Sequence, residues 1–284
     1  MRNQFFLVLA GGAAALAMAT PASAQTEAAP FDGFYVGGSL GYDFQPKGGN
    51  DTIQFDRNLD GTFGDTVTLT TPQANGNTNA FQPGFCRGQA NGVNASNGCR
   101  DNKDGTGYAA RIGFDKQFGA IVFGAVGEFG KSEIRDSVTA FSTTPAYYTM
   151  TREVDYDASA RLRLGFAANK TLFYGTGGVA YAKVDHSFET SNTANAFSDS
   201  GKSDAWGYVV GGGVEQKVGQ NFSVGLEYQY KTLKDDDYTV RAGSSATTPA
   251  ANPFIQGNAS GTDFQRSDDR LKSHSVRAVA AFRF

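Results

Sequence analysis

Residues 155–166 read DYDASARLRLGF, and apolar and polar side chains alternate along the whole stretch. One set of alternate positions holds Tyr156, Ala158, Ala160, Leu162, Leu164 and Phe166. The other set holds Asp155, Asp157, Ser159, Arg161, Arg163 and Gly165. Because successive side chains of a β-strand point to opposite faces, this stretch predicts a strand with one apolar face and one charged face.

Eight segments of the chain share this two-residue period or a composition rich in β-forming residues. They are residues 33–44, 108–117, 121–130, 155–166, 171–188, 206–217, 222–231 and 275–284. In residues 171–188 the composition indicates a strand, but alternation does not separate its two faces. The connections at residues 118–120, 169–170 and 219–221 are short, whereas those at about 45–105, 136–152, 189–203 and 235–268 are long and polar.

Short turns at one rim and long loops at the other are typical of an outer-membrane barrel. The predicted fold class is all-β: an eight-stranded antiparallel transmembrane β-barrel with short periplasmic turns and long extracellular loops. A sheet can span lipid only by closing on itself, because every backbone polar group must be paired within the protein. We expect Tyr147, Tyr148 and Phe254 to be exposed in the long loops.

A soluble lipocalin-like barrel is the alternative, because it also alternates but places its apolar side chains inside. Two features favour the membrane. The polar face carries acids and bases together, as a narrow interior needs for mutual neutralisation, and aromatic residues stand near segment ends, where membrane girdles lie. The charged residues are Arg111, Asp115, Glu128, Arg161, Arg163, Glu215, Glu227, Lys231, Arg277 and Arg283. The aromatic residues are Tyr42, Tyr108, Tyr156, Trp206 and Tyr230.

Residues 1–24 are typical of a secretory signal peptide. Arg2 precedes an uncharged apolar run from Phe5 to Met18, and Ala22-Ser23-Ala24 forms a small-x-small cleavage site. Residues 25–284 then form the barrel domain, with a long first outer loop at about 45–105. Export also permits a structural disulfide between Cys86 and Cys99, which lie in a stretch rich in Gly and Asn.

The composition limits the function classes. Gly 36, Phe 23 and Tyr 12 favour strands and turns over helices. A formal net charge of −3 gives no basic surface, so nucleic acid is not an expected partner. Two His and two Cys are too few for zinc-finger or iron–sulfur frameworks, and we expect no cofactor beyond a calcium ion.

Four stretches carry a resemblance to a known family: FDGFYVGGSLGYDF (31–44), LFYGTGGVAYAKV (172–184), AWGYVVGGGVE (205–215) and HSVRAVAAFRF (274–284). With the leader, they resemble the porin-family, OmpA-like eight-stranded outer-membrane β-barrel proteins of alphaproteobacteria, of the surface-antigen type. The resemblance implies a location in the outer membrane of a Gram-negative bacterium. It also implies that Phe282 and Phe284 carry the signal read by the barrel-assembly machinery.

The first long loop holds a candidate calcium site at Asp56, Asn58, Asp60 and Asp65. The D-x-N-x-D-G spacing places alternate oxygen ligands around a hard cation, and Gly61 permits the sharp turn. The glutamate expected at the twelfth position is replaced by Val67, so only Asp65 can substitute for it. The alternative is a turn rich in Asp and Asn that holds no metal.

The function we predict is structural: an envelope-stabilising, surface-exposed barrel without catalysis, in contact with outer-membrane lipid and lipopolysaccharide. One alternative is a narrow porin-like channel for ions or small solutes, because the inward charges could line a water path. A second is a lipid or peptide hydrolase at the outer rim that uses His186 or His274, although both also suit plain surface histidines. The long loops could bind a cell or phage surface, or simply shield the rim.

Overall fold

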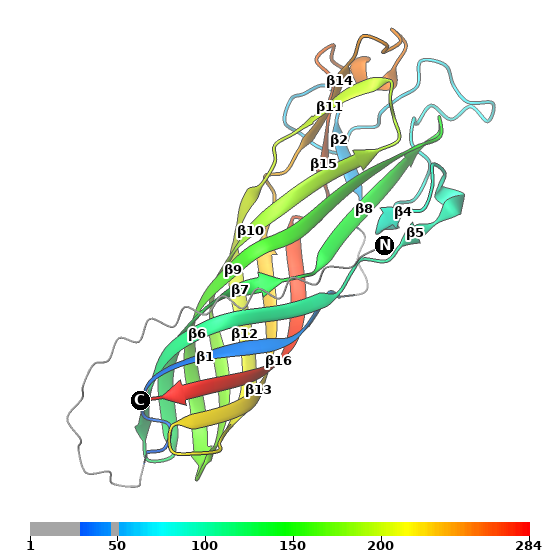
Figure 1. The fold of residues 1–284 in the computed structure, drawn as a ribbon. Helices are drawn as coiled ribbons and strands as arrows, with labels where there is room; N and C mark the ends of the chain where they lie inside the picture. The colour runs from blue at the N-terminus through cyan, green and yellow to red at the C-terminus, as the bar shows by residue number, and fades with distance from the viewer. Residues whose placement is uncertain (1–28, 47–50) are drawn as a thin grey trace, which may run out of the picture.

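The computed structural model describes residues 29–46 and 51–284, so the predicted signal peptide, residues 1–24, lies outside the described residues. The described chain is built from β-strands and two short 3-10 helices, η1 (Ala95–Asn97) and η2 (Pro253–Ile255). No helix in these two ranges has the length and apolar character needed to cross a membrane. Figure 1 shows an elongated molecule with a barrel at one end and a second β-structure at the other.

Eight long strands form the barrel, and each pairs antiparallel with two neighbours. They are β1 (Gly33–Phe44), β6 (Gly105–Phe118), β7 (Ile121–Ser132), β9 (Ala146–Ala168), β10 (Thr171–Thr190), β12 (Ser203–Lys217), β13 (Phe222–Lys234) and β16 (Arg270–Arg283). Pairing runs β1-β6-β7-β9-β10-β12-β13-β16 and returns to β1, where Gly38 lies opposite Ala280. The ring of pairings leaves no free edge in the barrel wall, as a span through lipid requires.

Most exposed side chains of the outer wall are apolar, and most of the charged side chains of these strands point into the barrel. Leu162 on β9 is 74% exposed, while its sequence neighbours Arg161 and Arg163 are 2% and 5% exposed. All ten charged residues assigned to the polar face are buried. The predicted orientation, with apolar side chains outward and ion pairs inward, is therefore confirmed. The soluble alternative is wrong.

Glycine makes room for the inward charges. A Cβ atom at Gly41 would collide with the backbone of β16 and with the side chain of Arg277, its cross-strand partner. A Cβ atom at Gly124 would likewise collide with the carboxylate of Asp115. An eight-stranded barrel is only just wide enough for its side chains, so a large inward charge needs a small cross-strand partner.

The long loops form a second structure, which corrects the expectation of irregular loops. Residues 136–152 are not a loop: β8 (Arg135–Ser142) pairs with the outer half of β9. A separate sheet has the order β11-β14-β15-β2. Its strands are β11 (Asn195–Asp199), β14 (Val240–Ser244), β15 (Thr262–Arg266) and β2 (Ile53–Asp56). We call residues 51–104, 133–155, 185–202 and 235–269 the head (Figure 1).

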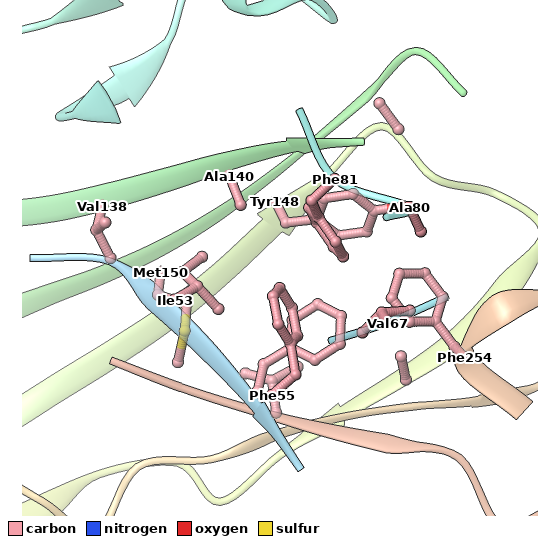
Figure 2. Close-up of a cluster of buried hydrophobic side chains, with 14 of the residues drawn as sticks. Ile53, Phe55, Val67, Ala80, Phe81, Val138, Ala140, Tyr148, Met150 and Phe254 are labelled. Carbon is pink, nitrogen blue, oxygen red and sulfur yellow. The ribbon is translucent and has the colours of Figure 1, made fainter. Parts of the chain in front are cut away.

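A hydrophobic core lies between the two sheets of the head. Phe264 on β15 is fully buried and packs against Phe55 and Phe81. Tyr148 and Phe254 are only 2% and 3% exposed, so the expectation that they lie exposed in loops is wrong. Figure 2 shows these side chains converging from distant parts of the chain. Their burial supplies the stabilisation that keeps such long connections ordered.

A disulfide joins Cys86 and Cys99, with Cα atoms 5.8 Å apart. It closes the lobe that contains β3 (Cys86–Arg87), β4 (Gln89–Ala90) and β5 (Cys99–Arg100). β3 pairs with β8, which ties this Asn- and Gly-rich lobe to the rest of the head. Closing a loop of this size contributes on the order of 3 kcal/mol.

Candidate functional site

The barrel lumen is the first candidate site, and ion pairs fill its middle. Arg161 donates to Glu227 at 2.8 Å and to Glu128 at 2.9 Å. Arg111 donates to the other oxygen of Glu227 at 2.9 Å, and Arg277 donates to Glu128 at 3.2 Å. Both carboxylates therefore bridge cations from different strands, so the network fastens opposite walls of the barrel.

Further ion pairs lie on either side of this layer. Towards the short turns, Asp115 accepts from Arg163 at 2.8 Å and from Arg283 at 2.9 Å. Towards the head, Lys231 pairs with Asp157. A cavity of about 10 Å³ beside Arg111 and Arg163 has roughly the space of a single water molecule.

Phe31 plugs the end of the lumen next to the short turns. Its side chain is fully buried and packs against Val122, Ala167 and Leu172. Its backbone N–H donates to the side chain of Gln117 at 3.0 Å, and its carbonyl accepts from Arg283 at 2.7 Å. Sequence reasoning missed this plug, because Phe31 precedes the first strand and belongs to no alternating pattern.

A second buried ion cluster lies in the head, at its junction with the barrel, and joins β8 and β9 to β15. Asp136 on β8 accepts from Arg152 on β9 at 2.8 Å and from Arg266 on β15 at 2.9 Å. Burial by itself raises the pKa of Asp136, but the guanidinium groups of Arg266 and Arg152 hold that pKa below its usual value. Stability from Asp136 is therefore present at neutral pH and is lost as the pH falls through the lowered pKa.

His186 lies in this junction and is not a surface residue. Its Nε2 atom is 3.1 Å from Asp235, and its Nδ1 atom is 3.1 Å from the carbonyl oxygen of Gly201. Its ring stacks on Tyr238 with 4.3 Å between centroids. Burial raises the pKa of Asp235, but the hydrogen bonds from His186 and Ser203 and the nearby charge of Arg152 together lower that pKa to about 2.

The contacts of the two histidines differ from those of a serine–histidine pair. Ser203 donates to Asp235 at 2.6 Å and not to the imidazole. Both nitrogens of His186 lie 3.1 Å from oxygen atoms, those of Gly201 and Asp235, and neither contacts a serine hydroxyl. His274 lies on the outer wall, where its Nδ1 atom is 2.6 Å from the hydroxyl of Tyr228 and its ring stacks on Phe44. The two histidines are therefore not brought together.

The predicted calcium ligands form a tight turn. Asp56 accepts backbone N–H groups of Leu59 and Gly61, each at 2.7 Å, and Asp60 accepts that of Thr62 at 2.8 Å. Asn58 donates to Asp60, and Asp65 accepts from the N–H of Arg57. Within the described residues no group of three or more His, Cys, Asp or Glu side chains is arranged to hold a metal. Calcium binding stays a prediction.

The predicted assembly residues Phe282 and Phe284 lie at the end of β16 on the outer wall. They are 46% and 72% exposed, and their rings meet edge to face at 5.3 Å. The backbone N–H of Phe284 donates to the carbonyl of Phe34 at 2.9 Å, which closes the seam between β16 and β1. The terminal aromatic pair is thus placed at the strand junction that completes the barrel.

A family model described as "Outer membrane protein beta-barrel domain" matches residues 11–284. The chain belongs to the outer-membrane β-barrel family. This barrel is therefore an outer-membrane protein of the Gram-negative cell surface, and the resemblance inferred from its sequence is confirmed.

Two curated relatives carry outer-membrane names. The barrel is 34% identical over 140 residues to a 22 kDa outer membrane protein of Rhizobium leguminosarum bv. viciae, covering 49% of this chain and 58% of that protein. It is 32% identical over 114 residues to a 31 kDa outer-membrane immunogenic protein of Brucella melitensis, covering 40% and 47%. The match thus spans about half the length of each relative.

Solved barrels of low similarity align along most of the chain. Ail, the attachment invasion locus protein of Yersinia pestis, is 15% identical with a TM-score of 0.33, covering 89% of this chain and 99% of Ail. The outer membrane protease OmpT of Escherichia coli is 11% identical with a TM-score of 0.37, covering 89% and 97%. At these scores the likeness carries no argument about function.

Proposed function

We propose that this barrel is a structural, envelope-stabilising protein that anchors a folded head at the cell surface, without catalysis and without a conducting pore. The observation that carries the proposal is the lumen, where Arg161 bridges Glu128 and Glu227 and leaves space for little more than one water molecule nearby. The fully buried Phe31 adds a plug at the periplasmic end. A lumen filled with ion pairs and closed by Phe31 at one end favours an anchor over a channel.

The absence of catalysis is supported by the junction between barrel and head. The His186 ring is held between two acceptors, and its side chain is 1% exposed. Ser203 is engaged by Asp235. This arrangement braces the strands β10, β12 and β13 at the rim, and it offers no nucleophile with a free general base.

Planar-bilayer recording of the refolded, full-length protein tests the function. We expect no single-channel steps from the wild type, and none from Phe31→Ala, because the ion-pair layers remain after the plug is removed. Phe222→Ala, on the outer wall, is the control for insertion without a change in the lumen. Reproducible conductance steps in the wild type would contradict the anchor function and support the narrow channel instead.

The partners follow from the two faces of the molecule. Outer-membrane lipid and lipopolysaccharide contact the apolar wall, and the barrel-assembly machinery receives the strand that ends at Phe282 and Phe284. Deletion of Phe284 is expected to reduce insertion into the outer membrane several-fold, because the deletion removes the terminal aromatic residue and its backbone bond to Phe34.

Heat-modifiable gel migration of membrane extracts measures this insertion. Phe222→Ala is the matched control, because Phe222 is also an exposed aromatic residue of the outer wall near the short turns. Equal loss of insertion in both variants would show a general need for lipid-facing aromatics. Normal insertion of the chain that lacks Phe284 would contradict the assembly role proposed for this residue.

A further inference from the structure

A pocket opens at the end of the head that lies away from the barrel. The turn between β8 and β9 and the short helix η2 both lie at this end (Figure 1), and they enclose a volume of about 410 Å³. All four long connections of the chain contribute to its lining. Leu69 comes from the first connection, Pro145 from the second, Ala194 from the third and Pro253 from the fourth. We call it the head pocket.

The floor and walls of the head pocket are held in place by the fold. Tyr148 and Phe254 form the floor, and they are only 2% and 3% exposed because they belong to the hydrophobic core of the head (Figure 2). Their ring centroids lie 5.7 Å apart. The side-chain oxygen of Asn195 joins two walls, because it accepts from Asn192 at 3.0 Å and from Asn252 at 2.9 Å. A pocket held in this way needs little reorganisation to take up a ligand.

The lining of the head pocket favours an uncharged, mainly apolar ligand. Among the described residues that line it, none carries a charge. The amide of Asn192 is already engaged, since it donates to the hydroxyl of Tyr148 at 3.0 Å and accepts from the backbone N–H of Ala194 at 2.8 Å. A charged ligand would lose its water without gaining a partner, whereas an apolar ligand gains free energy by leaving water. Thr144 and Thr193 are exposed at the rim, so their hydroxyl groups can bond a polar atom of the ligand.

The volume of the head pocket suits a small molecule. Ligand pockets in proteins span about 300–1,000 Å³, and this pocket lies within that range. A cavity of about 150 Å³ holds one benzene molecule, so the head pocket has room for a ligand of at least two rings. A stable protein interface buries about 800 Å² on each partner, which is far more surface than one pocket of this size offers.

We propose that the head pocket binds an uncharged, mainly apolar small molecule of about two rings from the medium around the cell. The pocket lies at the end of the head opposite the barrel, so the surrounding water faces it and membrane lipid does not (Figure 1). The inference goes beyond the anchor function, because it gives the folded head a ligand of its own.

Photolabelling of the purified full-length protein in lipid vesicles with benzophenone tests the pocket. Benzophenone has two rings, no charge and one carbonyl group, and light makes its ketone form a bond with a nearby C–H group. Peptide mass spectrometry then locates the label. We expect saturable labelling within residues 142–148, 191–194 and 249–254. Benzophenone dissolved in the lipid labels the outer wall of the barrel, and this labelling serves as the internal reference.

A charged probe of the same shape tests the chemistry of the pocket. The probe is 4-benzoylbenzoate, which adds a carboxylate to the body of benzophenone. We expect it to label the residues of the head pocket about tenfold less, because an unpaired carboxylate is costly to bury. Equal labelling of the head by the two probes would contradict selection for an uncharged ligand.

Two variants fill the pocket with an added ring. Ala194→Phe and Ala251→Phe are each expected to reduce labelling of the head about tenfold, because the ring takes up space in which the ligand would be buried. Ala251 is exposed at the mouth, so this second variant decides the test if Ala194→Phe disturbs the fold. Ala259→Phe is the matched control, since Ala259 is an exposed alanine of the head that does not line the pocket.

Support requires saturable labelling of the pocket that both filled variants reduce and Ala259→Phe leaves unchanged. Labelling confined to the outer wall overturns the inference, as does labelling of the head that neither filled variant reduces. Native mass spectrometry of the same samples detects a dimer. A dimer that protects these head residues from the label would assign the pocket to a second copy and also overturn the inference. Membrane insertion and bilayer silence are measured separately, so failure here leaves the anchor function standing.

Discussion

Leu162→Arg is expected to destabilise the folded barrel in lipid vesicles by about 2–4 kcal/mol, the cost of an arginine on the lipid face near the middle of the membrane. Leu162 is 74% exposed, and it lies on β9 between Tyr156, whose ring packs against those of Phe129 and Tyr181 on the outer wall, and the short turn that follows Ala168. A charge at this depth has no water and no counter-ion. Denaturant unfolding of the vesicle-inserted protein gives the free energy.

Val93→Arg is the matched control, since Val93 is 38% exposed but belongs to the head, outside the membrane. The same substitution there is expected to change the free energy of unfolding by less than about 0.5 kcal/mol. Equal effects at the two positions would mean that the wall around Leu162 does not face acyl chains. The assignment of the apolar side chains to the lipid-facing side of the barrel would then be wrong.

Glu227→Leu is expected to destabilise the barrel by about 3–5 kcal/mol, because the change removes one partner from a buried ionic network. Glu227 has no exposed surface and accepts from Arg111, Arg161 and the hydroxyl of Tyr174. Without its carboxylate, two buried guanidinium groups lose a counter-charge. The same unfolding measurement gives the value.

Glu153→Gln provides the comparison from a solvent-exposed pair. The side chains of Arg135 and Glu153 are 43% and 44% exposed, so loss of their ion pair is expected to cost less than about 1 kcal/mol. A small effect of Glu227→Leu, comparable to that of Glu153→Gln, would show that water reaches the lumen charges. That result would favour a hydrated channel over a packed interior.

Strand placement in the barrel was largely predictable, and the residues that break the pattern show why it was not completely so. Tyr35, Val122 and Val126 interrupt the alternation in the sequence, and each turns out to be buried. The guanidinium carbon of Arg283 lies over the ring of Tyr35, 4.7 Å from the ring centroid. Apolar or aromatic side chains can point into the barrel wherever they pack against neighbouring side chains. A rule that assigns every apolar residue to the outer wall therefore places Tyr35, Val122 and Val126 on the wrong face.

The head and the junction were not predictable from local patterns. Ile53, Phe81, Tyr148 and Phe254 come from three different connections and pack into one core. His186 lies next to Asp185 and Ser187 in the sequence, but its contacts are Asp235 and Tyr238. Isolated apolar residues in polar segments show no strand or helix periodicity. The local sequence therefore does not indicate that these side chains pack together in the folded protein.

The amino-acid sequence alone determined the eight spanning strands, their order, the short turns and the orientation of the apolar face. These follow from the two-residue period of a strand and from the need to pair every backbone group in lipid. Only the tertiary structure decided which charges pair, that Phe31 closes the lumen, and that the loops fold into a head. Such contacts join residues as far apart as Asp43 and Arg277, at 3.0 Å, and they depend on packing in three dimensions.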